Sequence, residues 1–391
     1  MKKILILTQE LYPASLGGSA KVAWQQAKMF ADLNYNVTVI STDNGANDHY
    51  KNINIFSYSK LNKSKSFNDL TEGKKTIKKV LKDNTFDLVI IHHPYIGKAF
   101  LDLKVEIPYI YMFHASTALE TKQQGMDISN KYKLLGKIIQ PFFIQYTKQI
   151  ENQLLKQAKQ VWALSQFSKS LIRKYFPKVG NIIKVIPYIA DTENFKPSND
   201  KNKLRAELNI NTKDKIAITV RRLVPRMGLE WLINSWSNIN NKYPNLKLLI
   251  IGSGYLKTQL QYIITKHKLG DKIILLGNVP EDILIKYYQA ADLFILPTLA
   301  YEGFGLVTVE ALACGLPVIG TNIGATPEIL KPLDKNLLLQ NLDAIALLNT
   351  IDYIFVNKKR LASAANQFCI NNYSQTNNQI FTELLNKAFL I

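Results

Sequence analysis

The most informative part of this chain reads Pro297-Thr298-Leu299-Ala300-Tyr301-Glu302-Gly303-Phe304-Gly305-Leu306-Val307-Thr308-Val309-Glu310-Ala311-Leu312-Ala313-Cys314-Gly315-Leu316-Pro317. It places seven residues between two glutamates, Glu302 and Glu310. A buried-strand pattern, Ala291 to Pro297, comes before the first glutamate, and an Ala-rich helical pattern carries the second. A strand, a glycine-containing turn and a helix N-terminus form a ready anion site, because unpaired backbone N–H groups and the helix dipole point at one spot.

The glycines of this turn and the two carboxylates indicate which ligand the anion site takes. Gly303 and Gly305 allow a ligand to approach the backbone closely. A carboxylate beside a phosphate site is suited to accept hydrogen bonds from the hydroxyls of a sugar or a ribose. Eight helical positions span about 12 Å, so Glu302 and Glu310 can contact two ends of one elongated ligand.

This stretch resembles the E-x7-E signature of the retaining nucleotide-sugar glycosyltransferases of family 4, which have the GT-B fold. The match extends to Glu-Gly-Phe-Gly-Leu at 302–306 and to Glu-Ala-Leu-Ala-Cys-Gly-Leu-Pro-Val-Ile at 310–319. The resemblance implies that Glu302 holds the donor sugar and stabilises positive charge developing on its ring, while Glu310 holds the ribose hydroxyls. It also implies that the donor meets the backbone of the intervening residues Gly303, Phe304, Gly305, Leu306 and Val307.

Composition restricts the class of protein further. The 391 residues suffice for two domains, and a hydrophobic content of 47% excludes wholesale disorder. The two cysteines, Cys314 and Cys369, are too few for a disulfide framework and indicate a reducing cytosol. No apolar run reaches about 18 residues, so we expect no membrane span and a cytoplasmic protein.

The net charge of +19, from 49 basic and 30 acidic side chains, predicts an anionic partner. No RNP, KH or zinc-finger pattern points to nucleic acid. Two Lys-rich segments carry much of the charge, Lys60 to Lys82 and Lys131 to Lys148. The second interleaves lysines with aromatic and aliphatic residues and is interrupted by Pro141, so it fits a helix on an anionic membrane surface as well as a core-packed helix with solvated lysines.

Short apolar runs alternate with helix-period segments, which is the pattern of parallel α/β layers. We predict helices at Ala20–Leu33, Leu229–Asn240 and Tyr255–Lys268. The predicted strands are Lys3–Thr8, Asn36–Ser41, Asp87–His92, Tyr109–His114, Gln160–Ser165, Lys184–Pro187, Lys215–Val220, Lys247–Gly252, Ile273–Gly277, Leu293–Pro297 and Val318–Thr321. They give an α/β fold of two Rossmann-like, doubly wound domains.

The domain boundary is predicted in the polar stretch Ala190–Leu204. Before it, Val185 to Asp191 resembles the "IPNG(V)D" linker of family 4, with Tyr188 at the usual Asn. We therefore predict an acceptor-side domain at 1–190, a donor domain at 191–370, and a terminal segment at 371–391 whose helix, Gln375–Phe389, crosses back to the first domain. Because ligands of open α/β sheets bind outside the strand carboxyl ends, we expect the two domains to face each other across a cleft.

A dinucleotide-binding fold is the obvious alternative for such a pattern. The residues after the first strand, Thr8 to Gly18, do not form G-x-G-x-x-G. Gly252-Ser253-Gly254 supplies a G-x-G without the last glycine, which is weak evidence.

Gly17 and Gly18 follow the first strand and precede a helix, where they form either a backbone cradle for phosphate or acceptor or an ordinary turn. The resemblance favours the cradle, because family 4 has Gly-Gly there. His114 ends a strand at the position where many family members carry a histidine near the donor sugar. His92 and His93 form a similar strand-end pair, to which we assign a structural or acceptor-side place.

Arg221-Arg222-Leu223-Val224-Pro225-Arg226-Met227-Gly228 resembles the family "GRL…KG" motif, in which an Arg and a Lys neutralise the donor diphosphate. Arg222 matches the motif Arg. Met227 occupies the Lys position and Arg221 the motif Gly, so the second cation must come from elsewhere, and Arg226 and Arg221 are the candidates. In Ser165-Gln166-Phe167-Ser168, which resembles the family "SxxS" segment, Ser168 is predicted as a helix N-cap.

The sequence thus predicts a retaining glycosyltransferase that moves a hexose-type sugar from a nucleotide diphosphate donor to a glycan or lipid-linked acceptor, in bacterial cell-surface polysaccharide or glycolipid synthesis. No Asp-x-Asp motif lies near a strand end, so we expect neither a metal nor a cofactor. Two alternatives stay open: a nucleotide-sugar 2-epimerase of the same fold, and a catalytically degenerate basic protein that binds surfaces.

Overall fold

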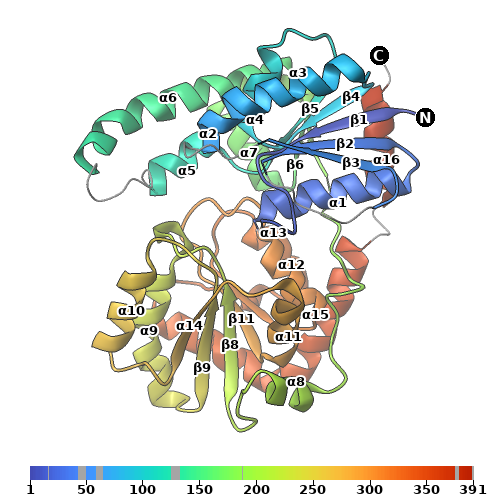
Figure 1. Ribbon diagram of the computed structural model, residues 1–391. Coiled ribbons are helices and arrows are strands. Elements are labelled where there is room, and N and C mark those ends of the chain that lie inside the picture. The colour runs from blue at the N-terminus through green and yellow to red at the C-terminus, as the bar shows by residue number, and fades with distance from the viewer. Residues whose placement is uncertain are drawn as a thin grey trace. The chain divides into compact units, whose positions relative to one another are not determined.

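The computed structural model describes residues 1–15, 17–42, 50–58, 65–124, 133–186, 188–374 and 378–389. The chain forms two compact units (Figure 1). The first unit comprises Met1–Ile186 together with Phe381–Ile391, and the second comprises Pro187–Ile380.

A seven-stranded parallel sheet forms the centre of the first unit, in the order β3-β2-β1-β4-β5-β6-β7. The strands are β1 (Lys3–Leu7), β2 (Asn36–Ser41), β3 (Ile53–Ser57), β4 (Leu88–Ile91), β5 (Tyr109–Phe113), β6 (Gln160–Ala163) and β7 (Ile183–Val185). The inner strands β1, β4, β5 and β6 are almost wholly buried, because helices cover both faces of the sheet (Figure 1).

The helices of the first unit are α1 (Gly18–Asp32), α2 (Lys65–Asn68), the π-helix η1 (Asp69–Gly73), α3 (Lys74–Asp83), α4 (Pro94–Leu101), α5 (Thr117–Gln124), α6 (Lys133–Gln157), α7 (Gln166–Tyr175), the 3-10 helix η3 (Pro177–Ile182) and α16 (Asn378–Phe389). The last of these belongs to this unit through its side chains. Phe381 of α16 is buried, with its ring 5.6 Å from that of Phe30 and 5.0 Å from that of Trp162. Phe389 stacks on Tyr35 at 5.5 Å.

The second unit has a five-stranded parallel sheet in the order β10-β9-β8-β11-β12. Its strands are β8 (Lys215–Val220), β9 (Leu246–Ile251), β10 (Ile273–Gly277), β11 (Leu293–Leu296) and β12 (Val318–Gly320). Its helices are α8 (Lys201–Glu207), the 3-10 helix η4 (Pro225–Met227), α9 (Leu229–Lys242), α10 (Lys257–Lys266), α11 (Glu281–Ala290), α12 (Leu306–Ala313), α13 (Thr326–Leu333), the 3-10 helix η5 (Lys335–Leu337), α14 (Ala344–Val356) and α15 (Lys358–Tyr373). Helices α9 and α10 lie on one face of the sheet, and α11 and α15 on the other (Figure 1).

The predicted fold class, α/β with two Rossmann-like, doubly wound sheets, is confirmed. The eleven predicted strands are all present, three of them with the predicted bounds and the others with ends that differ by at most two residues. The twelfth, β3, was missed because it is a half-exposed edge strand: it alternates polar and apolar residues and pairs with β2 alone among the described strands. Residues 375–377 of the predicted terminal helix lie outside the described residues, and α16 begins at Asn378.

Both Lys-rich segments lie partly outside the described residues, and one expectation about the second segment needs correction. Residues 60–64 and 131–132 are not described. The prediction that Pro141 interrupts its helix was wrong, because α6 continues through it to Gln157. The side chains of Thr147, Ile150 and Glu151 are buried, and this tertiary packing outweighs the local cost of proline in a helix. Among the described residues, no helix is long and apolar enough to cross a membrane.

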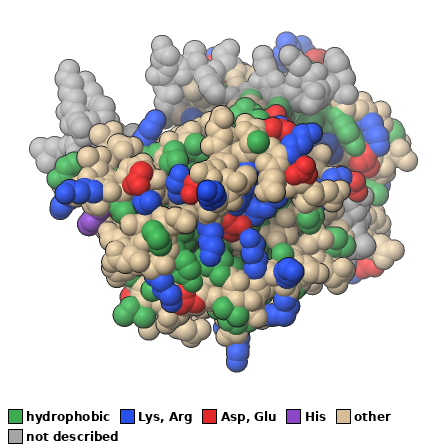
Figure 2. Space-filling model, turned by 90° about the horizontal axis from the view of Figure 1, so that it is seen from below, with side chains coloured by type: hydrophobic (Ala, Val, Ile, Leu, Met, Phe, Trp, Pro, Cys, Tyr) green, Lys and Arg blue, Asp and Glu red, His purple; other side chains and the backbone are tan. Residues whose placement is uncertain are grey.

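Basic side chains are distributed over the face shown in Figure 2, with acidic ones between them. Several basic side chains of the second unit are paired with carboxylates. Lys242 pairs with Asp352, Lys247 with Asp214, and Lys286 with Glu207. Part of the positive charge of this unit is therefore compensated locally.

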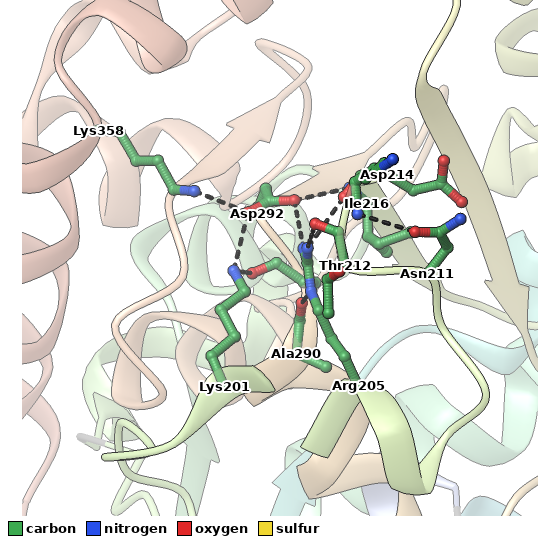
Figure 3. A network of polar contacts seen from close by, with 11 residues as sticks. Lys201, Arg205, Asn211, Thr212, Asp214, Ile216, Ala290, Asp292 and Lys358 are labelled. Carbon is green, nitrogen blue, oxygen red and sulfur yellow. Dashed lines mark hydrogen bonds and ion pairs between the residues drawn. The ribbon is translucent and has the colours of Figure 1, made fainter. Parts of the chain in front are cut away.

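One buried carboxylate joins α8, β8, β11 and α15. Asp292 is 4% exposed and forms ion pairs with Lys201, Arg205 and Lys358 (Figure 3). Its Oδ2 also accepts the backbone N–H of Ile216 at 2.7 Å. Burial alone would raise the pKa of Asp292, but the charges and hydrogen bonds of Lys201 and Lys358 outweigh it and hold the pKa well below its ordinary value of 3.8.

We expect Asp292→Asn to lower the free energy of unfolding of the second unit by about 3–5 kcal/mol, because it leaves the buried guanidinium of Arg205 without its countercharge. Because the folded-state pKa is lowered, the stabilisation is present above pH 3.8 and declines as the pH falls below it. Urea denaturation followed by circular dichroism measures both effects.

The matched control is Glu207→Gln, which removes the carboxylate of a partly exposed ion pair with Lys286. It should cost far less than Asp292→Asn, because solvent screens an exposed ion pair. Equal losses in the two variants would show that Asp292 is not the carboxylate on which these four elements depend.

Candidate functional site

The loops after β8, β11 and β12 approach one another so closely that glycine is required at the contacts. A Cβ on Gly228 would lie 1.8 Å from the carbonyl oxygen of Pro297, and one on Gly324 would lie 2.4 Å from that of Glu302. A Cβ on Gly252, in the loop after β9, would lie 2.0 Å from the carbonyl oxygen of Arg221. These loops leave the carboxyl ends of parallel strands, where ligands of open α/β sheets bind.

Glu302 lies in the loop after β11 and is 7% exposed. Its Oε2 forms an ion pair with the Nη2 group of Arg221 and accepts the hydroxyl hydrogen of Thr298 at 2.8 Å. The same Nη2 group donates to Thr298 Oγ1 at 2.5 Å. The backbone carbonyl of Glu302 accepts the N–H of Ala325 at 2.9 Å. The loops after β8 and β11 therefore hold the carboxylate of Glu302, and the loop after β12 holds its backbone.

Glu310 lies on α12, which begins after Gly305 as predicted. Gly305 has a φ of +89°, the left-handed conformation that glycine adopts without strain. Glu310 is 4% exposed, and its Oε2 accepts the hydroxyl hydrogen of Tyr288 at 3.0 Å. Burial and the neighbouring Glu310 raise the pKa of Tyr288 well above its ordinary value. Tyr288 thus remains a neutral donor that orients the carboxylate.

The first turn of α12 contains a buried hydroxyl that the protein leaves unsatisfied. Thr308 is 1% exposed, and its Oγ1 has no hydrogen-bond partner among the described residues. The N-terminal turn of a helix also presents backbone N–H groups and the positive end of its dipole. This arrangement is suited to an anionic ligand.

The three arginines of the loop after β8 have different surroundings. Arg222 is exposed, whereas Arg221 and Arg226 are buried. Arg221 contacts Glu302, and the Nη1 group of Arg226 donates to the carbonyl oxygen of Tyr301 at 3.2 Å. Met227 is also buried.

The other residues predicted to bind the donor substrate are of two kinds: some are partly exposed at the start of α12, and the side chain of one is packed inside the protein. Gly303, Leu306 and Val307 are partly exposed at the start of α12. Phe304 is buried, and its ring lies 5.6 Å from Tyr188 and 5.8 Å from Tyr373. The side chain of Phe304 therefore packs the loop, which leaves its backbone for contact with a ligand.

In the first unit, Gly17 is the N-cap of α1 and Gly18 its first residue, as the strand, turn and helix pattern predicted. The backbone N–H of Lys21 donates to the carbonyl oxygen of Gly17 at 3.0 Å. The prediction that Ser168 caps α7 was wrong. Ser165 is the N-cap, and its hydroxyl accepts the N–H of Ser168 at 3.0 Å.

His114 follows β5 and forms a pair with His92, which follows β4. The distance from His92 Nδ1 to His114 Nε2 is 3.0 Å, and the stacked rings have centroids 5.2 Å apart. Burial lowers the pKa of His114 to about 3, and burial and His114 lower that of His92 well below its ordinary value of 6.5. Both rings are therefore neutral near pH 7.

His93 belongs to a second cluster in the first unit. Its Nδ1 lies 3.2 Å from Oδ2 of the buried Asp69 in the π-helix η1. Asp69 also accepts hydrogen bonds from Gln9 at 2.7 Å and from Tyr58 at 2.6 Å. Sequence reasoning left His92 and His93 without a motif, because their partners are distant in the chain.

Three more residues escaped the sequence analysis: Thr298, Tyr288 and Glu151. Glu151 of α6 is buried and accepts hydrogen bonds from the Ser116 hydroxyl at 2.7 Å and the Thr117 N–H at 2.6 Å. It thereby anchors the start of α5, just after His114. Burial raises the pKa of Glu151 to about 7. Thr298 alone had a local signal, since it follows a buried strand.

Comparisons with known proteins cover nearly the whole chain. Residues 16–194 match the profile described as Glycosyltransferase Family 4, and residues 200–368 match that of Glycosyl transferases group 1. An uncharacterized glycosyltransferase of Methanocaldococcus jannaschii is 28% identical over 258 residues, which are 66% of this chain and 61% of that relative. The chain thus spans less than two thirds of that relative's length.

Solved structures resemble the fold over the full length. Sucrose-phosphate synthase from Thermosynechococcus elongatus has a TM-score of 0.83 at 20% identity, covering 100% of this chain and 99% of that one. Anabaena HepE, solved with UDP and glucose, has a TM-score of 0.75 at 22% identity, covering 99% and 100%. These neighbours confirm the predicted GT-B fold.

We expect His92 and His114 to remain neutral at pH 5, because burial lowers the pKa of His114 to about 3 and burial beside His114 lowers that of His92 well below 6.5. Below pH 6.5 these two histidines bind protons in the unfolded chain but not in the folded one. Their burial therefore lowers the free energy of unfolding as the pH falls below 6.5. Their contact needs one hydrogen between the two nitrogens, so the rings must be both Nδ1–H or both Nε2–H. Nitrogen-15 NMR of the side chains reports charge and tautomer directly.

The exposed imidazole of His267 gives the reference spectrum of a solvated ring. An imidazolium at His92 or His114 at pH 5, or unlike tautomers in the two rings, would contradict the paired geometry.

Proposed function

Because the chain belongs to glycosyltransferase family 4, we propose that it transfers a hexose-type sugar, with retention, from a nucleotide diphosphate donor to a glycan or lipid-linked acceptor. Bacterial cell-surface polysaccharide or glycolipid synthesis is the proposed setting. The observation that carries the proposal is the pair of buried carboxylates, Glu302 and Glu310, on either side of the α12 N-terminus.

In the proposed donor complex, Glu310 accepts hydrogen bonds from the ribose hydroxyls, with Tyr288 fixing one of its oxygens. The N-terminus of α12, the unsatisfied Thr308 hydroxyl and Arg222 receive the diphosphate. Arg226 is the proposed second cation. Preorganised groups of this kind stabilise the charge on the departing diphosphate, which is usually the largest catalytic term. The proposed reaction needs no metal or cofactor.

Glu302 is proposed to bind hydroxyls of the donor sugar, together with the backbone of Gly303 and Gly305. For the first unit we propose that His114 meets a sugar oxygen and that the backbone of Gly17 and Gly18 meets phosphate or acceptor. A neutral His114 can donate or accept a hydrogen bond, whereas its lowered pKa makes a positive charge unavailable near pH 7.

UDP-glucose and GDP-mannose are the first donors to test, since HepE was solved with UDP-glucose and a Corynebacterium glutamicum relative is named as GDP-mannose-dependent. Donor-dependent release of the nucleoside diphosphate, with the sugar configuration of the product read by NMR, would support retaining transfer. Conversion of the donor into its 2-epimer would favour the epimerase. A protein that binds no nucleotide sugar at all would favour the degenerate alternative.

We expect Glu310→Gln to weaken binding of the nucleoside diphosphate roughly fivefold to tenfold, because a neutral acceptor replaces a charged one. Titration calorimetry measures this. Glu328→Gln, the same change on the exposed surface of α13, is the control. If Glu310→Gln left the affinity unchanged, Glu310 would have only a structural role, as the acceptor of the Tyr288 hydroxyl hydrogen.

We also propose that α6 binds an anionic membrane surface, which would explain part of the +19 charge. Ile139, Phe142 and Tyr146 are exposed at 43%, 75% and 43%, and their spacing places them on one face of the helix. Lys148 and Lys156 are exposed on the same helix. An apolar helix face with lysines is suited to lie in the interface of an anionic bilayer.

We expect Phe142→Ser to weaken binding to vesicles that contain anionic lipid about tenfold, because an inserted Phe gains about 1.5–3 kcal/mol from burial. Sedimentation with anionic and with zwitterionic vesicles measures it. Val356→Ser is the control, since Val356 is 84% exposed on α14 of the other unit. Equal binding of both variants and the unaltered protein would rule out this face.

A further inference from the structure

Arg221 occupies the place at which the family motif has glycine, and its guanidinium contacts Glu302. We propose that Arg221 is a positioning residue: it holds Oε2 of Glu302 so that Oε1 is presented to the donor sugar, and it does not bind the diphosphate. This inference rests on the proposed role of Glu302 in holding the donor sugar.

The side-chain hydrogen bonds of Glu302 within the described residues all go to Oε2. Arg221 and Thr298 both contact Oε2, and they also contact each other, which closes a three-membered polar cluster. Oε1 has no hydrogen-bond partner among the described residues. Two protein donors hold one oxygen of this carboxylate. The other oxygen therefore points in a fixed direction and can accept a hydrogen bond from one hydroxyl of a ligand.

Contacts with β9 and the loop after it hold the backbone of Arg221 in place. Its N–H donates to the carbonyl oxygen of Ile251 at 2.9 Å, and its carbonyl oxygen fills the space that a Cβ on Gly252 would need. Arg221 is 9% exposed, so few solvent paths lead to its guanidinium. A guanidinium that is buried and already paired is poorly placed to bind a diphosphate that enters the site from solvent.

The pairing also changes the charge that Glu302 offers to the sugar. In a buried pair the guanidinium cancels most of the field of the carboxylate. Glu302 then recognises a hydroxyl through a hydrogen bond and contributes less to stabilising positive charge on the sugar ring. Among the three arginines of this loop, the exposed Arg222 is left as the principal ligand of the diphosphate.

Two binding measurements separate this role from that of a phosphate ligand. Arg221→Gln should leave the Kd of the nucleoside diphosphate within about twofold, whereas Arg222→Gln should weaken it about tenfold or more, since charge-assisted hydrogen bonds are the strong ones. Titration calorimetry with UDP and GDP measures both. Similar losses in the two variants would overturn the proposal and make Arg221 a diphosphate ligand.

Turnover provides the second arm. Arg221→Gln should lower kcat about tenfold or more with little change in nucleotide affinity, because Glu302 loses the orientation in which it meets the donor sugar. Arg221→Lys should restore part of the loss. The double variant Arg221→Gln/Glu302→Gln should be no slower than Glu302→Gln alone, because residues that act through one another are not additive. Additive losses in the double variant would overturn the positioning role.

Circular dichroism and the melting temperature of each variant show whether it is folded, and Arg221→Lys retains the cation if Arg221→Gln does not fold. Failure of the proposed function has a separate signature. In that case the unaltered protein binds neither UDP nor GDP and turns over no donor, and both proposals fall together.

Discussion

Close contact between backbones is the constraint on which the site of the second unit depends. Carbonyl oxygens of Pro297, Arg221 and Glu302 fill the spaces where the β-carbons of Gly228, Gly252 and Gly324 would lie. Any larger residue at these glycines would push the loops apart, because the clashing atoms belong to the backbone and cannot rotate away. The loops after four neighbouring strands are thereby held at fixed spacing. The directions of Glu302 and Arg221 follow from that spacing, since both side chains start from backbone that has no room to shift.

Most of the fold was predictable because its signals are local. Inner strands of a parallel sheet are continuous apolar runs, and the helices between them have their own period. The exception, β3, lies at the edge, where Ile53 and Ile55 alternate with polar neighbours and half the strand faces solvent. Such a short alternation is hard to tell from a loop. At Pro141 the local signal was present but misleading. Proline predicts the end of a helix, yet α6 continues through it because side chains farther along the helix are packed in the protein.

The site was predictable in outline and not in its contacts. The spacing of Glu302, Gly305 and Glu310 indicated a strand, a turn and a helix, and the structure has all three. The partners of these residues come from far along the chain: Arg221 lies 81 residues before Glu302, and His92 lies 22 residues before His114. Neither pair has a local pattern, because each depends on which strands are neighbours in the sheet. Sequence reasoning therefore identified Arg221 as a cation without showing that a carboxylate already accompanies it.

Helix α16 has a consequence for how the chain is made. The first unit takes its last helix from the far end of the sequence, with Phe381 packed between Phe30 and Trp162. A ribosome that has finished all seven strands of this unit has still to synthesise the whole second unit before that helix emerges. Until then Phe30, Tyr35 and Trp162 lack the aromatic partners that Phe381 and Phe389 later provide. A chain that stopped before Asn378 would contain every strand of both sheets and would lack the helix whose Phe381 packs on Phe30 and Trp162.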